Sequence, residues 1–128
     1  VKTGAFTVSI ADVENVVACD YVGIASGNKE PDKIEKAGWH IIKSEFVNAP
    51  LFDELPMALE CKLISYDEET CRLVGEIVNV CADERILDEN GKIDAKKVDP
   101  IIYDSVTHAY WSFGEKVGQA FSDGKKIK

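Results

Sequence analysis

Two long stretches with the alternation of β-strands flank the acidic turn DEET, and they constrain the fold more than any other feature. These stretches, PMALECKLISY and TCRLVGEIVNVCA, are typical of a long antiparallel hairpin. One face of the first is apolar and is expected in the core: Met57, Leu59, Cys61 and Leu63. Glu60 and Lys62 fall on the other face. The second stretch is apolar on both sides, which predicts a strand covered by a barrel interior and by a helix or another subunit.

Shorter elements are expected on either side of the hairpin. Residues 5–11 alternate like a half-buried strand, and residues 12–23 predict a short helix capped by Asp12. Residues 32–38 predict one or two helical turns ended by Gly38, followed by an extended segment.

The segment after the hairpin, DERILDENGKIDAKKVDPIIYDS, first suggests a calcium loop centred on Gly91. That interpretation fails because Ile86 and Lys97 would occupy positions that need acidic ligands. We expect a turn at ENG, a short helix capped by Asp94, and a short strand or buried apolar segment after Pro100.

Size and charge exclude several classes of partner. A chain of 128 residues with 45% hydrophobic residues predicts one domain covering 1–128. The net charge of −8 repels polyanions, so neither nucleic acid nor an anionic membrane is expected as a partner. No apolar run reaches the roughly 20 residues of a membrane span and no secretory leader is recognisable. A cytoplasmic location is therefore expected.

The four cysteines do not predict a metal site. Cys19, Cys61, Cys71 and Cys81 are too far apart for a CxxC arrangement, and the chain has only two histidines. Because the last three fall in predicted strands, we expect reduced thiols in the core.

The loop ASGNKEPDKI is the first candidate for binding. The small residues Ala25, Ser26 and Gly27 would let backbone approach a ligand, and Lys29 and Lys33 could meet an anionic group. The alternative, which composition alone favours, is a solvated turn in which Asp32 caps the next helix.

The aromatic segment near the end of the chain is a second candidate. A flat ligand could stack on Tyr110 or Trp111, although such a cluster also suits a core or a dimer contact. No serine, histidine and acid stand at the spacing of a nucleophile and its base, so hydrolysis has no support.

Taken in order, several segments resemble the flavin reductase-like proteins of the flavoredoxin type. These segments are GAFTVSIA, ACDYVGIASGNKEPDKI, APLFDELPMALECKL, LVGEIVNVCADERILDENGKID and DPIIYDSVTHAYWSFGEKVGQAFSDGKK. The resemblance covers nearly the whole chain. It implies an FMN-binding split β-barrel that acts as a homodimer. The fold class would be mainly β with short helices (α+β), antiparallel and of Greek-key type, with this chain as the C-terminal part of the barrel.

The resemblance also implies which residues hold the cofactor. It places Ser26, Gly27, Asp32 and Lys33 beside the flavin pocket, with Lys33 contacting an anionic group or the ring. It places Tyr110, with Trp111 beside it, near the isoalloxazine across the dimer contact. Two departures from the family pattern are a loop one residue longer through NKEP and Ile34 at a position where phenylalanine is typical. No catalytic side chain and no metal ligand is implied.

The implied function is that of a flavoprotein in electron transfer or in NAD(P)H-dependent flavin reduction. The flavin would supply the redox chemistry, NAD(P)H would be a transient substrate, and a redox partner would exchange electrons. Relatives begin with further strands that hold the FMN phosphate, and these do not precede Val1 in this sequence, so we expect FMN binding to be weak or absent. The alternative is a truncated, cofactor-free oligomerisation or binding module.

Overall fold

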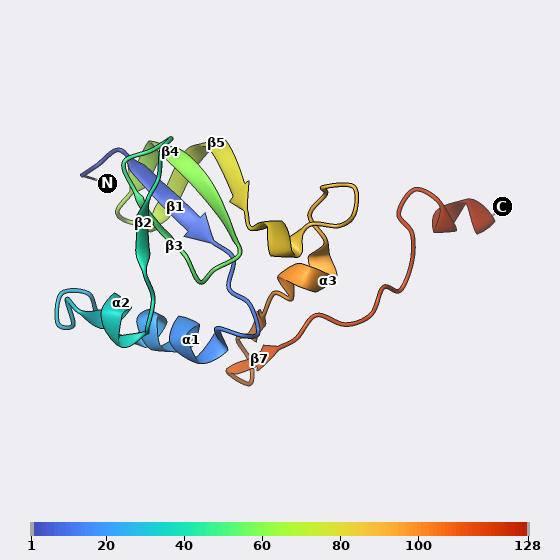
Figure 1. The fold of residues 1–128 in the computed structure, drawn as a ribbon, viewed down its shortest axis with the longest axis horizontal. Coiled ribbons are helices and arrows are strands. Elements are labelled where there is room, and N and C mark those ends of the chain that lie inside the picture. Colours follow the sequence, from blue (N-terminus) through green and yellow to red (C-terminus); the bar gives the residue numbers. More distant parts are fainter. Residues whose placement is uncertain (1, 128) are drawn as a thin grey trace.

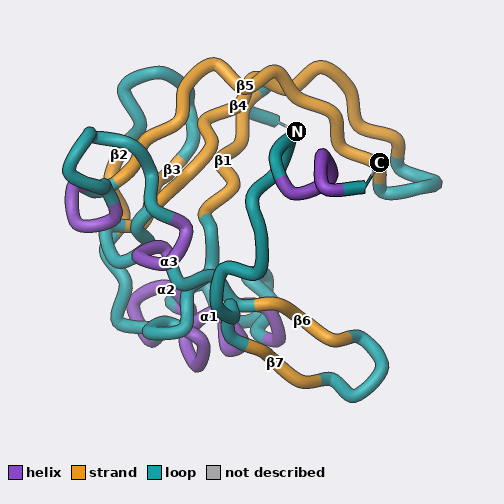
Figure 2. Tube along the Cα trace, turned by 90° about the vertical axis from the view of Figure 1, so that its right-hand side faces the viewer, coloured by secondary structure: helices purple, strands orange, loops and turns teal. Residues whose placement is uncertain are grey.

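The computed structural model describes residues 2–127 and contains three antiparallel sheets (Figures 1 and 2). The largest has the strand order β1-β4-β5. Its strands are β1 (Ala5–Ser9), β4 (Met57–Asp67) and β5 (Arg72–Ala82). The predicted hairpin is confirmed, because β4 pairs with β5 along its length, with two irregularities in register. The expected fold class of antiparallel strands with short helices is also confirmed.

Two smaller sheets are each made of one pair of strands. β2 (Ile41–Lys43) pairs with β3 (Pro50–Phe52), and β6 (Ile102–Asp104) pairs with β7 (Ala109–Trp111). Figure 2 shows the β6–β7 hairpin projecting from the body on the side of the helices. Of the two alternatives expected after Pro100, a short strand or a buried apolar segment, the structure has the strand.

The helices are short. They are α1 (Val16–Ile24), α2 (Lys33–Lys36) and α3 (Ala95–Val98), with 3-10 turns at Glu84–Ile86 and Asp123–Lys126. α3 is capped as predicted, since the Asp94 side chain accepts a hydrogen bond from Lys96 N at 2.9 Å. α1 begins at Val16, later than expected; the buried Asp12 side chain accepts hydrogen bonds from the backbone and side-chain nitrogens of Asn15, in the turn before the helix. Across residues 2–127, no helix has the length and apolar character that a membrane crossing requires.

The core lies partly on the opposite face of β4 from the one the alternation predicts. Ala58 and Glu60 are 4% and 1% exposed, whereas Met57, Leu59 and Leu63 are only half-buried. The cause is the β2–β3 segment, which covers the Ala58 and Glu60 side of the sheet: Ser44 Oγ donates to Glu60 Oε1 at 2.5 Å. The expectation of an apolar core face was right for Cys61 alone, which is 3% exposed.

Exposure tests two other expectations. Ile77 and Val80 of β5 are 56% and 44% exposed, so the described part of the chain does not cover this strand on both faces, and its cover by another subunit stays a prediction. Cys71 lies in the turn and is exposed with a left-handed backbone (φ 55°), so it is not a core thiol. All four cysteines are free, as expected.

A histidine and a glutamate join the start of β2 to the segment before β4. His40 Nδ1 lies 2.5 Å from Glu54 Oε1, and this hydrogen bond raises the pKa of His40. Burial acts against ionisation of Glu54, but hydrogen bonds from His40 outweigh it and lower the pKa of Glu54.

The pair predicts a stability that depends on pH. Because the pKa of His40 is raised in the folded protein, its contribution to stability is complete below the unfolded pKa of 6.5 and is lost as pH rises through the folded pKa. Because the pKa of Glu54 is lowered, its contribution is complete above the unfolded pKa of 4.5 and is lost as pH falls through the folded pKa. The contribution of the His40–Glu54 pair to the melting temperature should therefore be largest between pH 4.5 and pH 6.5. His40→Gln should flatten the pH profile slightly, since His40 is exposed; an unchanged profile contradicts the prediction.

Candidate functional site

The loop between α1 and α2 is held by Lys33. Its Nζ donates to the carbonyl oxygens of Val22 at 2.8 Å and of Ala25 at 3.0 Å. These carbonyls belong to the last turn and end of α1, where backbone acceptors lack partners within the helix and a positive charge is favourable. Lys33 thus has two of its three N–H donors engaged with the protein, and one is left for a ligand.

The other predicted loop residues surround this lysine. Ser26 O accepts from the backbone nitrogens of Lys29 and Glu30, which closes the turn. A Cβ on Gly27 would lie 3.9 Å from Lys33 Cε, so the loop backbone passes over the lysine side chain. Ser26, Gly27 and Lys33 are therefore brought together in one loop, and their contact with a flavin stays a prediction.

Asp32 has a different role from the predicted helix cap. Its side chain makes no capping hydrogen bond to α2. Instead Asp32 Oδ1 lies 3.2 Å from Lys36 Nζ, which is also 2.5 Å from Glu30 Oε2. Hydrogen bonds to Glu30 and Asp32 raise the pKa of Lys36 above its ordinary value. The two acids therefore hold Lys36 on the exposed side of the loop.

Tyr110 of β7 is joined to the middle of α1. Its hydroxyl donates to Asp20 Oδ1 at 2.7 Å, and this bond raises the pKa of Tyr110. The Tyr110 ring lies 5.6 Å from the ring of Tyr103 on β6. The Tyr103 hydroxyl is in turn 2.8 Å from His108 Nδ1.

These groups line a hollow of about 360 Å³ between α1 and the β6–β7 hairpin. Its walls are formed by Asp20, Gly23, Ile24, Tyr103, His108 and Tyr110. Trp111 does not line it, and its side chain is 61% exposed. The structure thus separates two residues that the sequence placed together, because neighbours in a strand point to opposite faces.

Helix α1 links the two groups of predicted site residues. Its middle holds Tyr110 through Asp20, and its last turn holds Lys33. No sequence pattern predicted Asp20, Tyr103 or His108 as residues of this site. For Asp20 a signal existed, since it is the only charged residue in the otherwise apolar VVACDYVGI of α1. His108 had no such signal, because only the hairpin brings it beside Tyr103.

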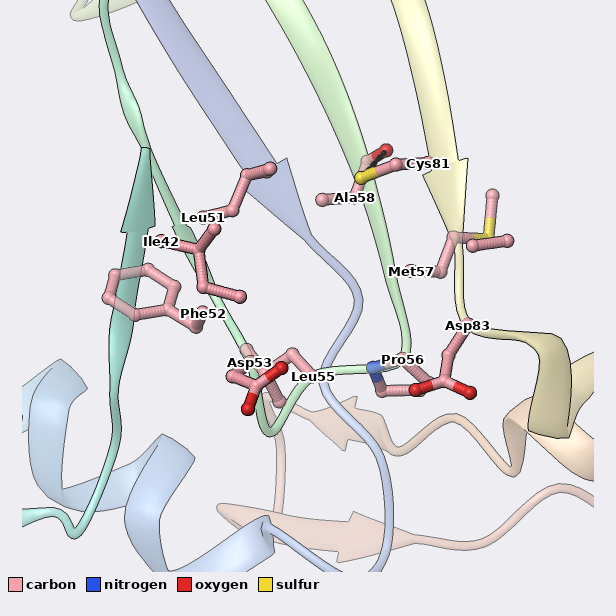
Figure 3. A pocket seen from close by; sticks show the side chains of 11 residues that line it. Ile42, Leu51, Phe52, Asp53, Leu55, Pro56, Met57, Ala58, Cys81 and Asp83 are labelled. Carbon is pink, nitrogen blue, oxygen red and sulfur yellow. Dashed lines mark hydrogen bonds between the residues drawn. The ribbon is translucent and has the colours of Figure 1, made fainter. Parts of the chain in front are cut away.

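A second hollow of about 170 Å³ lies where the β2–β3 pair faces the ends of β4 and β5 (Figure 3). Ile42, Leu51 and Phe52 lie across from Ala58 and Cys81. Burial and the nearby Glu60 carboxyl raise the pKa of the Cys81 thiol, which favours its neutral form. None of the six predicted site residues lines this hollow. Within residues 2–127 no group of three side chains is arranged to hold a metal ion.

Comparison with known proteins gives consistent matches. A family model described as "Flavin reductase like domain" matches residues 1–107. The structure is similar to a flavoredoxin of Desulfovibrio vulgaris (Miyazaki F), with 42% identity, a TM-score of 0.89 and coverage of 96% of this chain and 66% of that one. It is also similar to a flavoredoxin from Methanosarcina acetivorans, with 31% identity, a TM-score of 0.85 and coverage of 99% and 67%.

A protein from a third organism is similar to this chain in sequence. An uncharacterized protein of Aquifex aeolicus (strain VF5) is 35% identical over 74 residues, which cover 56% of this chain and 38% of the relative. This chain therefore spans about two thirds of each flavoredoxin and aligns with a smaller share of the Aquifex protein.

Proposed function

Because this chain belongs to the flavin reductase-like domain family, we propose that it binds FMN and serves in electron transfer or in NAD(P)H-dependent flavin reduction. We place it in the cytoplasm as a single domain that works as a pair of identical copies. The observation that supports flavin binding most directly is the hollow with aromatic walls between α1 and the β6–β7 hairpin. The resemblance implies that Tyr110, one of its wall residues, lies near the isoalloxazine across the dimer contact, whereas this hollow is formed within one chain.

The residues of the hollow fit a flavin ring better than a phosphate. Tyr103 and Tyr110 offer aromatic faces on which a flat ring stacks. The lining contains the carboxylate of Asp20 and no lysine or arginine. A phosphate placed there would be repelled, so the hollow is assigned to the ring alone.

The chain's own side chains position the ring rather than react with it. When bound, the flavin supplies the hydride or single-electron chemistry. The Tyr110 hydroxyl donates to Asp20, which holds the end of the tyrosine side chain against α1, and the same hydrogen bond raises the pKa of Tyr110 above its ordinary value. Lys33 does not line the hollow, and its remaining N–H donor is the candidate for contact with an anionic part of the cofactor.

FMN titration, followed by the flavin absorbance spectrum, tests the proposal. Tyr110→Ala should raise the dissociation constant for FMN about tenfold, since loss of ring stacking costs on the order of 1.4 kcal/mol. Tyr66→Ala is the matched control, because Tyr66 is 39% exposed against 40% for Tyr110 and lies on β4. Equal effects of the two substitutions would contradict the assignment of the hollow.

The two forms of the function are separated by kinetics. A flavin reductase should consume NADH or NADPH in the presence of free FMN, whereas an electron carrier should be reduced without sustained turnover.

The alternative of a cofactor-free binding module is favoured by the many exposed apolar side chains, such as Val106 at 87%. It predicts colourless protein whose melting temperature does not rise with added FMN.

A further inference from the structure

Asp20 gives the hollow between α1 and the β6–β7 hairpin a negative charge. It is the one acid among the lining residues, which include no lysine or arginine. Within residues 2–127, no basic side chain lies within ion-pair distance of its carboxylate. No cation in this part of the chain therefore neutralises the charge of Asp20.

The partner that Asp20 does have is a neutral donor. The Tyr110 hydroxyl donates to Asp20 Oδ1 at 2.7 Å. A hydroxyl is uncharged, so its hydrogen bond orients the carboxylate and leaves the negative charge in place. Because the bond spans from β7 to α1, it holds this charge at the wall that the aromatic ring of Tyr110 also forms.

Tyr110 shows the effect of this charge on its surroundings. The hydrogen bond to Asp20 is the main reason why the pKa of Tyr110 is raised, and the negative charge of Asp20 acts in the same direction. A second negative charge at this wall is thus disfavoured. The same repulsion applies to a ligand that becomes negative in the hollow.

Lys33 is not placed to offset the repulsion inside the hollow. It does not line the hollow, and its Nζ donates to the carbonyl oxygens of Val22 and Ala25 at the end of α1. A ring bound in the hollow would therefore meet the carboxylate of Asp20 and no ammonium or guanidinium group.

A flavin ring becomes negative when it is reduced. The oxidised ring is uncharged, and it takes two electrons and one proton from a reductant to become a reduced ring with one negative charge. No bond to the protein forms or breaks; on reoxidation the electrons pass to an acceptor and the proton is released. A carboxylate at the wall repels the reduced ring and not the oxidised ring. A ring that displaces water from the exposed Asp20 side chain strengthens this repulsion.

We propose that Asp20 makes the hollow discriminate between the two redox states of the flavin, so that the oxidised ring is bound more tightly than the reduced ring. The inference rests on FMN binding in the proposed function and adds the residue that sets the redox potential of the bound cofactor. A weaker hold on the reduced ring lowers this potential and makes the bound flavin a stronger reductant. The site thereby favours passing electrons on, or releasing reduced flavin, over retaining them.

The midpoint potential of bound FMN, measured against a reference dye, tests the inference. Asp20→Asn removes the charge and keeps an oxygen that accepts from Tyr110. The ratio of the dissociation constants for reduced and oxidised FMN should fall about fivefold in this variant, which raises the potential by about 20 mV. Glu69→Gln is the matched control, because it removes the same charge from the exposed β4–β5 turn and lines no wall of the hollow. Equal shifts in the two variants overturn the inference.

A titration without cofactor tests the charge of Asp20 separately. In the ultraviolet spectrum, the tyrosine whose signal is absent in Tyr110→Phe is Tyr110. Asp20→Asn should lower the pKa of Tyr110 toward its ordinary value, because the carboxylate that raises it is gone. An unchanged titration shows that Asp20 imposes no field on the hollow and overturns the inference even when the variant is folded normally.

The outcomes separate the inference from the proposed function. If FMN binds and Tyr110→Ala weakens it, but Asp20→Asn leaves the potential of bound FMN unchanged, the inference is wrong and the proposed function stands. If neither the wild type nor Asp20→Asn binds FMN, the proposed function is wrong and the inference falls with it. Melting temperatures of the cofactor-free variants show which of them are folded.

Discussion

Replacing Glu60 by alanine is expected to lower the free energy of unfolding by about 3 kcal/mol, because one buried and one half-buried donor lose their acceptor. The side chain of Glu60 is 1% exposed and lies between the β2–β3 segment and β5. Ser44 Oγ donates to one carboxyl oxygen and Asn79 Nδ2 to the other, each at 2.5 Å. Ser44 Oγ also accepts from the backbone nitrogens of Phe46 and Val47, so its proton has Glu60 as its partner.

The measurement is urea unfolding of wild type and variant. Glu60→Gln should cost less, about 1 kcal/mol, because one amide oxygen still accepts a hydrogen bond and little volume is lost. Glu45→Ala is the control for the loss of a carboxyl group, since Glu45 is an exposed neighbour of Ser44 and its replacement should stay within about 0.5 kcal/mol. If Glu60→Ala unfolds like Glu45→Ala, the buried hydrogen bonds do not stabilise the fold.

Gly75→Ala should destabilise the sheet by about 2 to 3 kcal/mol, because an added methyl group has no space. A Cβ on Gly75 would lie 2.5 Å from Cζ of Phe6, 2.6 Å from its Cε1 and 3.0 Å from Lys62 O. The ring of Phe6, from β1, thus lies against the bare backbone of β5. A ring can turn away only by losing this contact, and the Lys62 oxygen belongs to the backbone of β4.

A double-mutant cycle checks the cause. Phe6→Leu removes the ring atoms that the methyl group meets, so the cost of Gly75→Ala in that background should fall by about 1 kcal/mol or more. Gly23→Ala in α1 is the control, because no atom lies within 4 Å of its Cβ position. That change should be neutral or stabilising, since alanine favours helix over glycine. Additive costs at Phe6 and Gly75 would refute the close contact.

Local sequence patterns were reliable where neighbouring residues decide the structure. The alternation around DEET predicted the β4–β5 hairpin, and Asp94 was correctly predicted to cap α3. Local sequence patterns failed where a segment distant in the chain decides which side chains are buried. Alternation placed Glu60 opposite the apolar stripe, on a face that looks solvent-facing, and only the β2–β3 segment folding over that face makes it the most buried charged side chain.

In the candidate site, too, the sequence pointed to some of the residues but not to the contacts that they make. The resemblance singled out Lys33, but its bonds to the end of α1 depend on how the loop folds back. Tyr110 and Trp111 are neighbours in sequence, yet only Tyr110 reaches α1, because strand geometry sends them to opposite sides. His108 and Asp20 enter the hollow from separate elements that no sequence spacing links.

By itself, the sequence determined the β4–β5 hairpin, the cap of α3 and the family, because these follow from side-chain alternation, local hydrogen bonding and motifs kept in order. Tertiary structure alone decided which face of β4 is buried, which donors of Lys33 are engaged and which aromatic residue lines the hollow. The physical reason is that burial and hydrogen-bond partners arise from contacts between segments far apart in the chain, which no local pattern encodes.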